Sequence, residues 1–235
     1  MSDEHESRVE RGLMRLQAGS GALFAVFLLA HLVNQMVAAA GPAAYDGVQA
    51  ELRAVYQVPA IEVALVGAPL VVHAVTSVLR VLRRRRRGQT AAPAVRTRLQ
   101  RWSAAVLLLF IVGHVVATRG TSLVYAVFPG FEAIAFTMVW QPAWFIPYYA
   151  VFAVAALYHA LHGLTLALPR LGLRGAGGRG ARAAVLWLVV IGSVLLLLGV
   201  AGFAGAFEAV RERAIAGDYA RVLEDVGLVD RAALR

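Results

Sequence analysis

The chain has 235 residues, 60% of them hydrophobic, and its charged residues are concentrated outside long apolar runs. This composition is typical of an integral membrane protein and excludes a soluble globular core. The formal net charge of +9 is localised, so nucleic acid is not an expected partner. The absence of cysteine excludes an iron–sulfur cluster or a covalently attached c-type haem within this chain.

Five segments are long enough to cross the apolar core of a bilayer, which takes about 20 helical residues. In chain order they lie near residues 17–40, 58–82, 102–118, 143–168 and 183–206. The first is longer than the core of a signal peptide and no convincing cleavage site follows it, so we expect it to be retained. The sequence therefore predicts an all-α integral membrane protein with five transmembrane helices.

The remaining segments set the domain boundaries. Residues 1–14 are predicted to form a polar, mobile N-terminus, residues 15–206 the membrane domain, and residues 207–235 a tail whose periodicity and mixed charge indicate an exposed helix. Residues 41–57 are expected to be a short polar connection and residues 119–142 a longer one. Four aromatic residues in and after the longer connection suit an interfacial belt: Trp140, Trp144, Tyr148 and Tyr149.

The distribution of arginine predicts the orientation. Three arginines flank the N-terminal end of the first predicted helix, and the loops 83–101 and 169–182 on the same side carry nearly all the other loop arginines. The positive-inside rule then makes the N-terminus cytoplasmic and, with five helices, the C-terminus external. The run Arg83–Arg87 is expected to act as a topology signal that contacts lipid headgroups; docking of a cytoplasmic partner is the alternative.

Each of the first four predicted helices contains histidine: His31, His73, His114, and the pair His159 and His162. Ionisable side chains within hydrocarbon are costly and usually functional. One such histidine is readily explained by a hydrogen bond to a neighbouring helix. Four consecutive helices that each supply one favour ligand binding.

A sequence repeat supports this interpretation. The stretch Arg15–Ser20 recurs 83 residues later as Arg98–Ser103, with the same Arg-Leu-Gln triplet and the same serine. The apolar helices that follow reach His31 and His114, and eight of the nineteen positions in 15–33 match their partners. A histidine at the same place in two similar helices indicates a repeated ligand position.

The expected depth of each histidine in the membrane predicts which two histidines lie close together. His31 and His114 lie in outward-running helices, nearer their outer ends, whereas His73 and His159 lie in inward-running helices, nearer the cytoplasmic ends. The two levels differ by about eight residues, or roughly 12 Å at 1.5 Å per residue. The sequence therefore predicts two bis-histidine sites, with an outer pair, His31 and His114, and an inner pair, His73 and His159.

The donor set favours haem over zinc. Two histidines without cysteine or carboxylate leave a zinc site short of ligands. Haem iron accepts two axial imidazoles, and the apolar faces of its ring suit a bundle interior. Ser77 and Gly163, each four residues after an inner histidine, would let a flat ring approach. Phe27 and Phe110, each four residues before an outer histidine, are expected beside that ring or in ordinary packing.

His159 and His162 compete for one ligand position because both can face the interior. His159 matches His73 at an offset of 86, and each is followed by alanine. Gly163 also follows His159 by one turn, so His159 is assigned as the ligand. His162 is expected to donate a hydrogen bond to a propionate, a quinone or the backbone. The three glycines Gly19, Gly21 and Gly113 are equally explained as helix–helix contact points.

Over about residues 10–206 this pattern resembles the cytochrome b558-type membrane subunit of succinate dehydrogenase and fumarate reductase. The resemblance rests on the five helices, the four histidine positions, the Arg15-Leu16-Gln17 entry and the stretch Tyr158–Leu164. It implies that His31, His73, His114 and His159 are the axial ligands of two b haems, so that the first four helices form a di-haem bundle. His162 departs from the pattern, since a small or amide residue is expected there.

The resemblance also implies partners. A flavoprotein subunit and an iron–sulfur subunit would bind on the cytoplasmic side of a bacterial cytoplasmic membrane and carry the dicarboxylate chemistry. This chain, which has no FAD fingerprint, would anchor them and pass electrons to or from membrane quinone, with menaquinone favoured. We expect the quinone at the outer side. The polar candidates for quinone or propionate contacts are Asn34, Gln35, Glu62, Arg119 and His162.

Two other functional classes fit the same residues. One is a different di-haem membrane cytochrome, such as a b561-like protein or a subunit of a hydrogenase or formate dehydrogenase. The other is a non-redox transporter or scaffold that uses the histidines for protons or a metal. Asn34, Gln35 and Glu62 are in addition explained as ordinary helix-end or interhelical polar groups.

Overall fold

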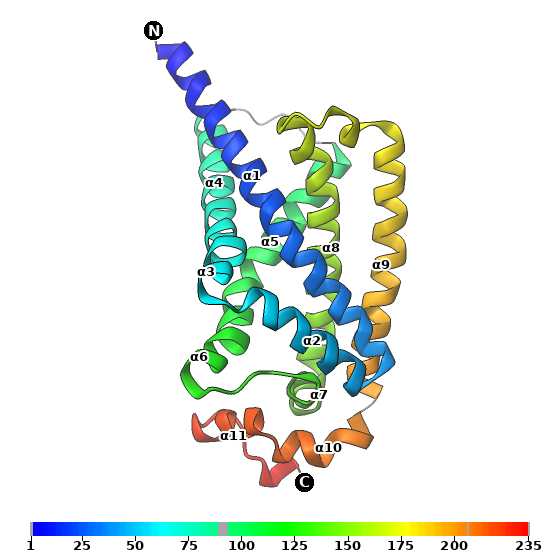
Figure 1. The fold of residues 1–235 in the computed structure, drawn as a ribbon. Coiled ribbons are helices and arrows are strands. Elements are labelled where there is room, and N and C mark those ends of the chain that lie inside the picture. Colours follow the sequence, from blue (N-terminus) through cyan, green and yellow to red (C-terminus); the bar gives the residue numbers. More distant parts are fainter. Residues whose placement is uncertain (1, 89–93, 206, 235) are drawn as a thin grey trace. The chain divides into compact units, whose positions relative to one another are not determined.

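The structure is a computed structural model that describes residues 2–88, 94–205 and 207–234, and every regular element in these ranges is helical (Figure 1). The α-helices, in chain order, are α1 (Ser2–Val37), α2 (Pro42–Tyr56), α3 (Pro59–Glu62), α4 (Ala68–Arg86), α5 (Val95–Val115), α6 (Thr121–Tyr125), α7 (Phe131–Trp140), α8 (Pro142–Arg170), α9 (Arg179–Gly205), α10 (Phe207–Ala216) and α11 (Asp218–Asp225). The π-helical turns Val63–Gly67 and Val116–Gly120 connect α3 to α4 and α5 to α6. Short 3₁₀ turns lie at Ala38–Ala40, Arg174–Gly177 and Ala232–Leu234.

Five segments of the described chain are long and apolar enough to cross a membrane: Arg8–Ala40, Pro59–Arg86, Val95–Tyr125, Pro142–Arg170 and Arg179–Gly205. They overlap all five predicted helices and extend beyond most of their ends; the second begins one residue later than predicted, and residue 206, the predicted end of the fifth, lies outside the described residues. Their outward apolar side chains are exposed, among them Leu109 at 72% and Trp187 at 66%. Such surfaces require lipid around them, so the prediction of an all-α, multi-pass membrane protein is confirmed. The middle of the expected basic loop, residues 89–93, lies outside the described residues.

The first predicted connection, 41–57, is more ordered than expected. Gly41, at φ +98°, follows the 3₁₀ turn that ends the first segment, and Pro42 starts α2 at once. This Gly-Pro order suits a helix stop followed by a helix start, because glycine adopts positive φ and proline has no amide hydrogen to lose. Tyr45 of α2 is fully buried. The segment is therefore a packed helix.

The chain divides into two compact units, which we describe separately. Unit 1 comprises Met1–Ala30, Ala54–Ala105 and Ala156–Val190. Unit 2 comprises His31–Arg53, Val106–Ala155 and Ile191–Arg235.

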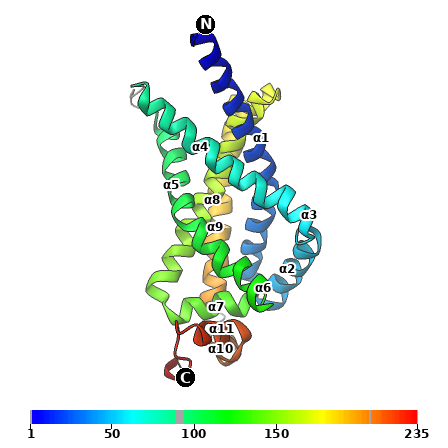
Figure 2. The ribbon, with the colours of Figure 1, turned by 90° about the vertical axis from the view of Figure 1, so that its left-hand side faces the viewer.

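The core of unit 2 forms around α7, within the segment that was predicted to be a connection. Phe131, Ala135 and Phe136 of α7 have no exposed surface. Helix α10 and the residues after it pack against α7 (Figures 1 and 2). The tail is thus helical, but its apolar face is buried rather than exposed, with Val210 at 1%. At ten residues α7 is too short to span a bilayer, so its apolar side chains are covered by protein.

Polar contacts fix both sides of α7. The Phe131 N–H donates to Oδ1 of Asp46 in α2 at 2.8 Å, so a residue from another helix satisfies one of the free amides at the start of α7. Gly130 makes room for this contact, since a Cβ there would lie 2.8 Å from Oδ1 of Asp46. Arg213 of α10 pairs with Glu132 at 2.8 Å. The buried helix is therefore held by α2 and α10.

We expect Gly199→Ala to destabilise unit 2. A Cβ at Gly199 of α9 would clash with the backbone oxygen of Gln35, and the backbone cannot move aside as a flexible side chain can. Overpacking of this kind typically costs about 1–3 kcal/mol. Thermal unfolding in detergent should show a lower midpoint. Gly205→Ala, in the same helix, is the control because a Cβ there meets nothing within 4 Å; equal midpoints for the two variants would contradict the close contact.

Candidate functional site

The structure brings four of the predicted histidines together in two pairs. In unit 1 the ring centroids of His73 (α4) and His159 (α8) lie 6.1 Å apart, with the planes inclined at 81°. In unit 2 the centroids of His31 (α1) and His114 (α5) also lie 6.1 Å apart, at 70°. These are the inner and outer pairs that the sequence predicts, and each pair belongs to one unit.

The spacing suits two imidazoles on opposite sides of one metal ion. A bond from a histidine nitrogen to zinc is about 2.0–2.1 Å long, a length we take for iron as well. A nitrogen in a five-membered ring with bonds of about 1.33 Å lies about 1.1 Å from the centroid. Two ligands in line would therefore have centroids about 6.3 Å apart. Ordinary edge-to-face packing of two rings also gives centroid distances of about 4.5–7 Å. The centroid distance alone therefore does not distinguish metal ligands from packed rings, and the hydrogen bonds of each imidazole are needed as well.

The hydrogen bond of His73 fixes its tautomer. Its Nδ1 lies 3.0 Å from the backbone oxygen of Gln17 in α1. A carbonyl oxygen can only accept, so Nδ1 carries the hydrogen and Nε2 keeps its lone pair. Histidines that bind metals characteristically donate their other ring N–H to such an acceptor. His73 is thus prepared to act as a ligand through Nε2.

His159 has a corresponding contact from α5. Its Nδ1 lies 3.2 Å from Oγ of Ser103 and 3.2 Å from Nε2 of Gln100. The Ser103 hydroxyl donates to the backbone oxygen of Gln100 at 3.1 Å, so its oxygen is available to accept from Nδ1 of His159. The Gln100 amide donates to the backbone oxygen of His159 at 3.1 Å. Ser103 and Gln100 therefore hold His159 at both its ring and its backbone.

The repeated glutamines give the Arg-Leu-Gln repeat a structural role. Gln17 Nε2 donates to Oγ of Ser77, four residues after His73, at 2.7 Å. Oε1 of Gln100 accepts from Nδ1 of His162, three residues after His159, at 2.9 Å. Each repeat thus joins its own helix to the helix that carries an inner histidine. Sequence reasoning did not assign these two residues, although the repeat itself was the signal.

His162 is engaged away from the inner pair. Its ring stacks on Tyr158 with centroids 5.3 Å apart and planes 6° from parallel, and its Nδ1 is bonded to Gln100. The geometry agrees with the choice of His159, rather than His162, as the partner of His73. Contact of His162 with a propionate or quinone stays a prediction.

One glycine makes room for an inner histidine. A Cβ at Gly21 of α1 would lie 2.5 Å from Nδ1 of His73, far inside van der Waals contact. A Cβ at Gly163 would lie 3.3 Å from Nε2 of Gln100. Gly19 and Gly113 differ, since a Cβ at either position meets nothing within 4 Å. Of the three glycines predicted as helix contacts, only Gly21 is required for close approach.

A half-buried ion pair lies two turns beyond His73 along α4 and was not predicted. Nε of Arg80 is 2.8 Å from Oε1 of Glu10, and the two side chains are 12% and 25% exposed. Arg80 also donates to Oε1 of Gln17. Since Arg80 follows His73 by two turns on the same helix face, it brings a cation close to the inner pair.

The outer pair lies in aromatic surroundings. Oη of Tyr148 is 3.5 Å from Nδ1 of His114, at the limit of a hydrogen bond, and the Phe152 ring is 5.3 Å from the His114 ring. Phe110 packs on Tyr148 at 5.1 Å. Phe27 instead packs on Tyr56 within unit 1, at 4.9 Å. The aromatic residues predicted as a membrane belt are divided: Trp144 is 59% exposed, whereas Tyr148 belongs to this cluster.

The polar residues predicted near the outer side have varied surroundings. Asn34 is fully buried and donates to Oε1 of Gln49 at 2.6 Å, while its Oδ1 has no hydrogen-bond donor within the described part of the chain. Gln35 donates to Oη of Tyr45 at 3.2 Å. Glu62 ends α3, and Arg119 lies in the π-helical turn after α5; both are half-buried. Quinone or propionate contacts for these residues stay predictions.

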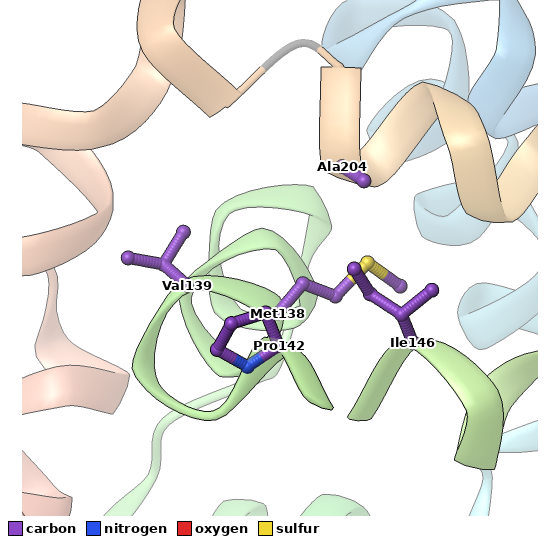
Figure 3. Close-up of a pocket in the computed structure, with 5 residues that line it drawn as sticks. All are labelled: Met138, Val139, Pro142, Ile146 and Ala204. Atoms are coloured by element: carbon purple, nitrogen blue, oxygen red, sulfur yellow. The ribbon is translucent and has the colours of Figure 1, made fainter. Parts of the chain in front are cut away.

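A separate apolar cavity of about 310 Å³ lies in unit 2 (Figure 3). Its lining residues are Met138, Val139, Pro142, Ile146 and Ala204. None of these side chains can donate a hydrogen bond, which a bound quinone carbonyl requires. The cavity therefore suits a hydrocarbon segment rather than a quinone head group.

The metal-ligating side chains that lie close together limit the kinds of metal centre that the protein can hold. Among the described residues no three His, Cys, Asp or Glu side chains gather into one group. A structural zinc site, which takes four such ligands, is thus not formed there. The two pairs suit an ion that takes its other ligands from a macrocycle, as haem iron does.

No protein-family model matches the chain, and neither a curated protein nor a solved structure matches it.

Proposed function

We propose that this protein is a di-haem cytochrome b, the membrane subunit of a bacterial succinate dehydrogenase or fumarate reductase. It would anchor the complex and carry electrons between the iron–sulfur subunit and membrane quinone. The observation that supports this most directly is the presence of two histidine pairs with centroids 6.1 Å apart. The carbonyl bonded to Nδ1 of His73 adds support, because it leaves Nε2 free for iron.

The chain's own residues would divide the work of cofactor binding. His73 and His159 would hold the inner haem, and His31 and His114 the outer haem. When bound, haem b supplies an iron centre that gains and loses one electron. Arg80 would balance the charge of an inner propionate, and Arg119 that of an outer one. Gln17 and Gln100 would keep the inner histidines oriented.

In this proposal the N-terminus is cytoplasmic, and the flavoprotein and iron–sulfur subunits bind on that side. The quinone, with menaquinone favoured, binds near the outer pair. Asn34 is a candidate contact because its buried Oδ1 lacks a donor within the described residues and a quinol hydroxyl could supply one. The aromatic side chains around His114 would provide apolar walls.

The direct test is the haem content of the purified protein. A pyridine haemochrome assay should give about two b haems per polypeptide. A content of one haem would contradict the proposed pairing. A colourless protein would favour the non-redox class.

Absorption spectra do not separate this proposal from other di-haem cytochromes, so the partners must be identified. Gentle purification of the complex should recover a flavoprotein and an iron–sulfur protein together with succinate-dependent haem reduction. Recovery of a hydrogenase or formate dehydrogenase instead would place the chain in that other class of cytochromes.

Ser103→Ala is expected to raise the midpoint potential of the inner haem while both haems remain bound. Loss of an acceptor for Nδ1–H makes the imidazole of His159 a weaker donor, which destabilises ferric relative to ferrous iron. A net hydrogen bond of roughly 0.5–1.5 kcal/mol corresponds to about 20–60 mV for one electron. Redox titration of the purified protein measures this shift.

Ser20→Ala is the matched control, since Ser20 is the repeat partner of Ser103 and, within the described part of the chain, bonds only to backbone oxygens of its own helix. An unchanged potential in Ser103→Ala would show that Ser103 does not accept from His159.

A further inference from the structure

Arginines in unit 1 outnumber the acids available to neutralise them. The sequence has no acidic residue between Glu62 and Glu132, or between Glu132 and Glu208, and these intervals include α4, α5, α8 and α9. Four arginines of these helices, which we call the basic cluster, are exposed in unit 1: Arg84, Arg96, Arg170 and Arg182. None of the four has an ion pair among the described residues.

The histidine pairing explains why two members of the basic cluster come together. Arg84 follows His73 by eleven residues, and Arg170 follows His159 by the same number. Eleven residues make about three helical turns, so each arginine returns to the face that carries its histidine. The two helices thus carry the two arginines in equivalent positions, beyond a point where their histidine rings lie 6.1 Å apart.

The electrostatic surroundings agree with this placement. The positive charges of Arg80 and Arg84 act on the guanidinium of Arg170. Those of Arg96 and Arg182 act on the imidazole of His162. Glu10 is already paired with Arg80, and among the described residues no other acidic side chain pairs with a member of the basic cluster. Positive charges brought close together repel one another unless an anion lies between them.

We propose that the basic cluster binds the head group of an anionic phospholipid, with the phosphodiester between Arg84 and Arg170. The inference is independent of haem binding. The guanidinium groups suit phosphate oxygens, which they can bind in a bidentate manner. The arginines also lie at the ends of membrane-spanning segments, which is where lipid head groups are found.

Exposed apolar residues beside the basic cluster favour a lipid over an acidic protein. Leu99 and Trp102 are 48% and 70% exposed in the same helix as Arg96, and Leu171 and Leu173 follow Arg170 at 44% and 61%. An acidic protein surface would neutralise the arginines but leave these side chains uncovered. A phospholipid offers a charged head and an apolar chain, and so matches both parts of this surface.

The test uses the full chain in vesicles of phosphatidylcholine with spin-labelled phosphatidylglycerol or spin-labelled phosphatidylcholine as the probe. The motionally restricted fraction gives the relative affinity of each lipid for the protein. Each arginine near a membrane surface contributes about 1 kcal/mol, which is about fivefold in affinity. The wild type should therefore prefer phosphatidylglycerol severalfold, and Arg84→Gln with Arg170→Gln should abolish this preference.

The charge-matched control replaces Arg213 and Arg221 by glutamine, because these arginines already have the acidic partners Glu132 and Asp218. It should keep the lipid preference. Unchanged thermal unfolding of the Arg84 and Arg170 variant would show that it folds. A wild type without preference, or a folded variant that keeps it, would overturn the proposal. Loss of co-purifying subunits from the variant with unaltered lipid preference would overturn it in favour of an acidic protein partner.

Discussion

Replacement of His73 or His159 by alanine is expected to reduce the haem content from about two to about one per polypeptide. Under the proposed function each inner histidine would supply one of the two protein ligands of its haem, so removal of one would leave that haem with a single protein bond. The outer pair belongs to the other unit and should keep its haem. Haemochrome assays and low-temperature spectra of the purified variants measure both effects.

Replacement of His31 or His114 should give the reverse result, with loss of the outer haem and retention of the inner one. His162→Ala is the control, because its ring contacts Tyr158 and Gln100 rather than His73. It should keep both haems. If His162→Ala loses a haem while His159→Ala keeps two, the assignment of the ligand in α8 is wrong.

Gly21→Ala should also remove the inner haem, although glycine has no side chain that could bind it. The added methyl group would lie 2.5 Å from Nδ1 of His73, so the imidazole must move. That movement also breaks the 3.0 Å contact between Nδ1 and the backbone oxygen of Gln17. Overpacking costs roughly 1–3 kcal/mol, comparable to a loss of affinity of about fivefold to 150-fold. Haem content after purification gives the result.

Gly19→Ala is the matched control two residues earlier in the same helix, where a Cβ meets nothing within 4 Å. That variant should keep both haems and gain up to about 1 kcal/mol of helix propensity. A Gly21→Ala protein that binds two haems with normal spectra would show that His73 does not require the space beside Gly21.

The five spans and the histidine pairs were predictable from the sequence because both depend on one-dimensional properties. Long apolar runs define spans, and position along alternately directed helices defines depth. Pairing of His73 with His159 requires only these two properties. The hydrogen bonds of Gln17 and Gln100 were not predictable, since they depend on how α1 packs on α4 and α5 on α8. The repeat pointed to these residues without showing what they contact.

The burial of α7 was missed for a different reason. Phe131–Trp140 is an apolar helix of ten residues, too short to span a bilayer, so it was included in a connection. The residues that bury it belong to α2, α9 and α10, which lie far away in the sequence. Amphipathic periodicity in the tail predicted the helix, but nothing local in the chain indicated which surface its apolar face would contact.

This arrangement sets an order for the synthesis of the protein. A ribosome that adds about 5–20 residues per second completes α10 several seconds after α7. During that interval Phe131 and Phe136 lack the helix that covers them in the finished protein. The last part of the messenger RNA is therefore required to complete unit 2. A ribosome that stops before Phe207 would release a chain with five spans in which the face of α7 that contacts α10 is uncovered. Such a product would be a substrate for membrane quality control, although every histidine had already been made.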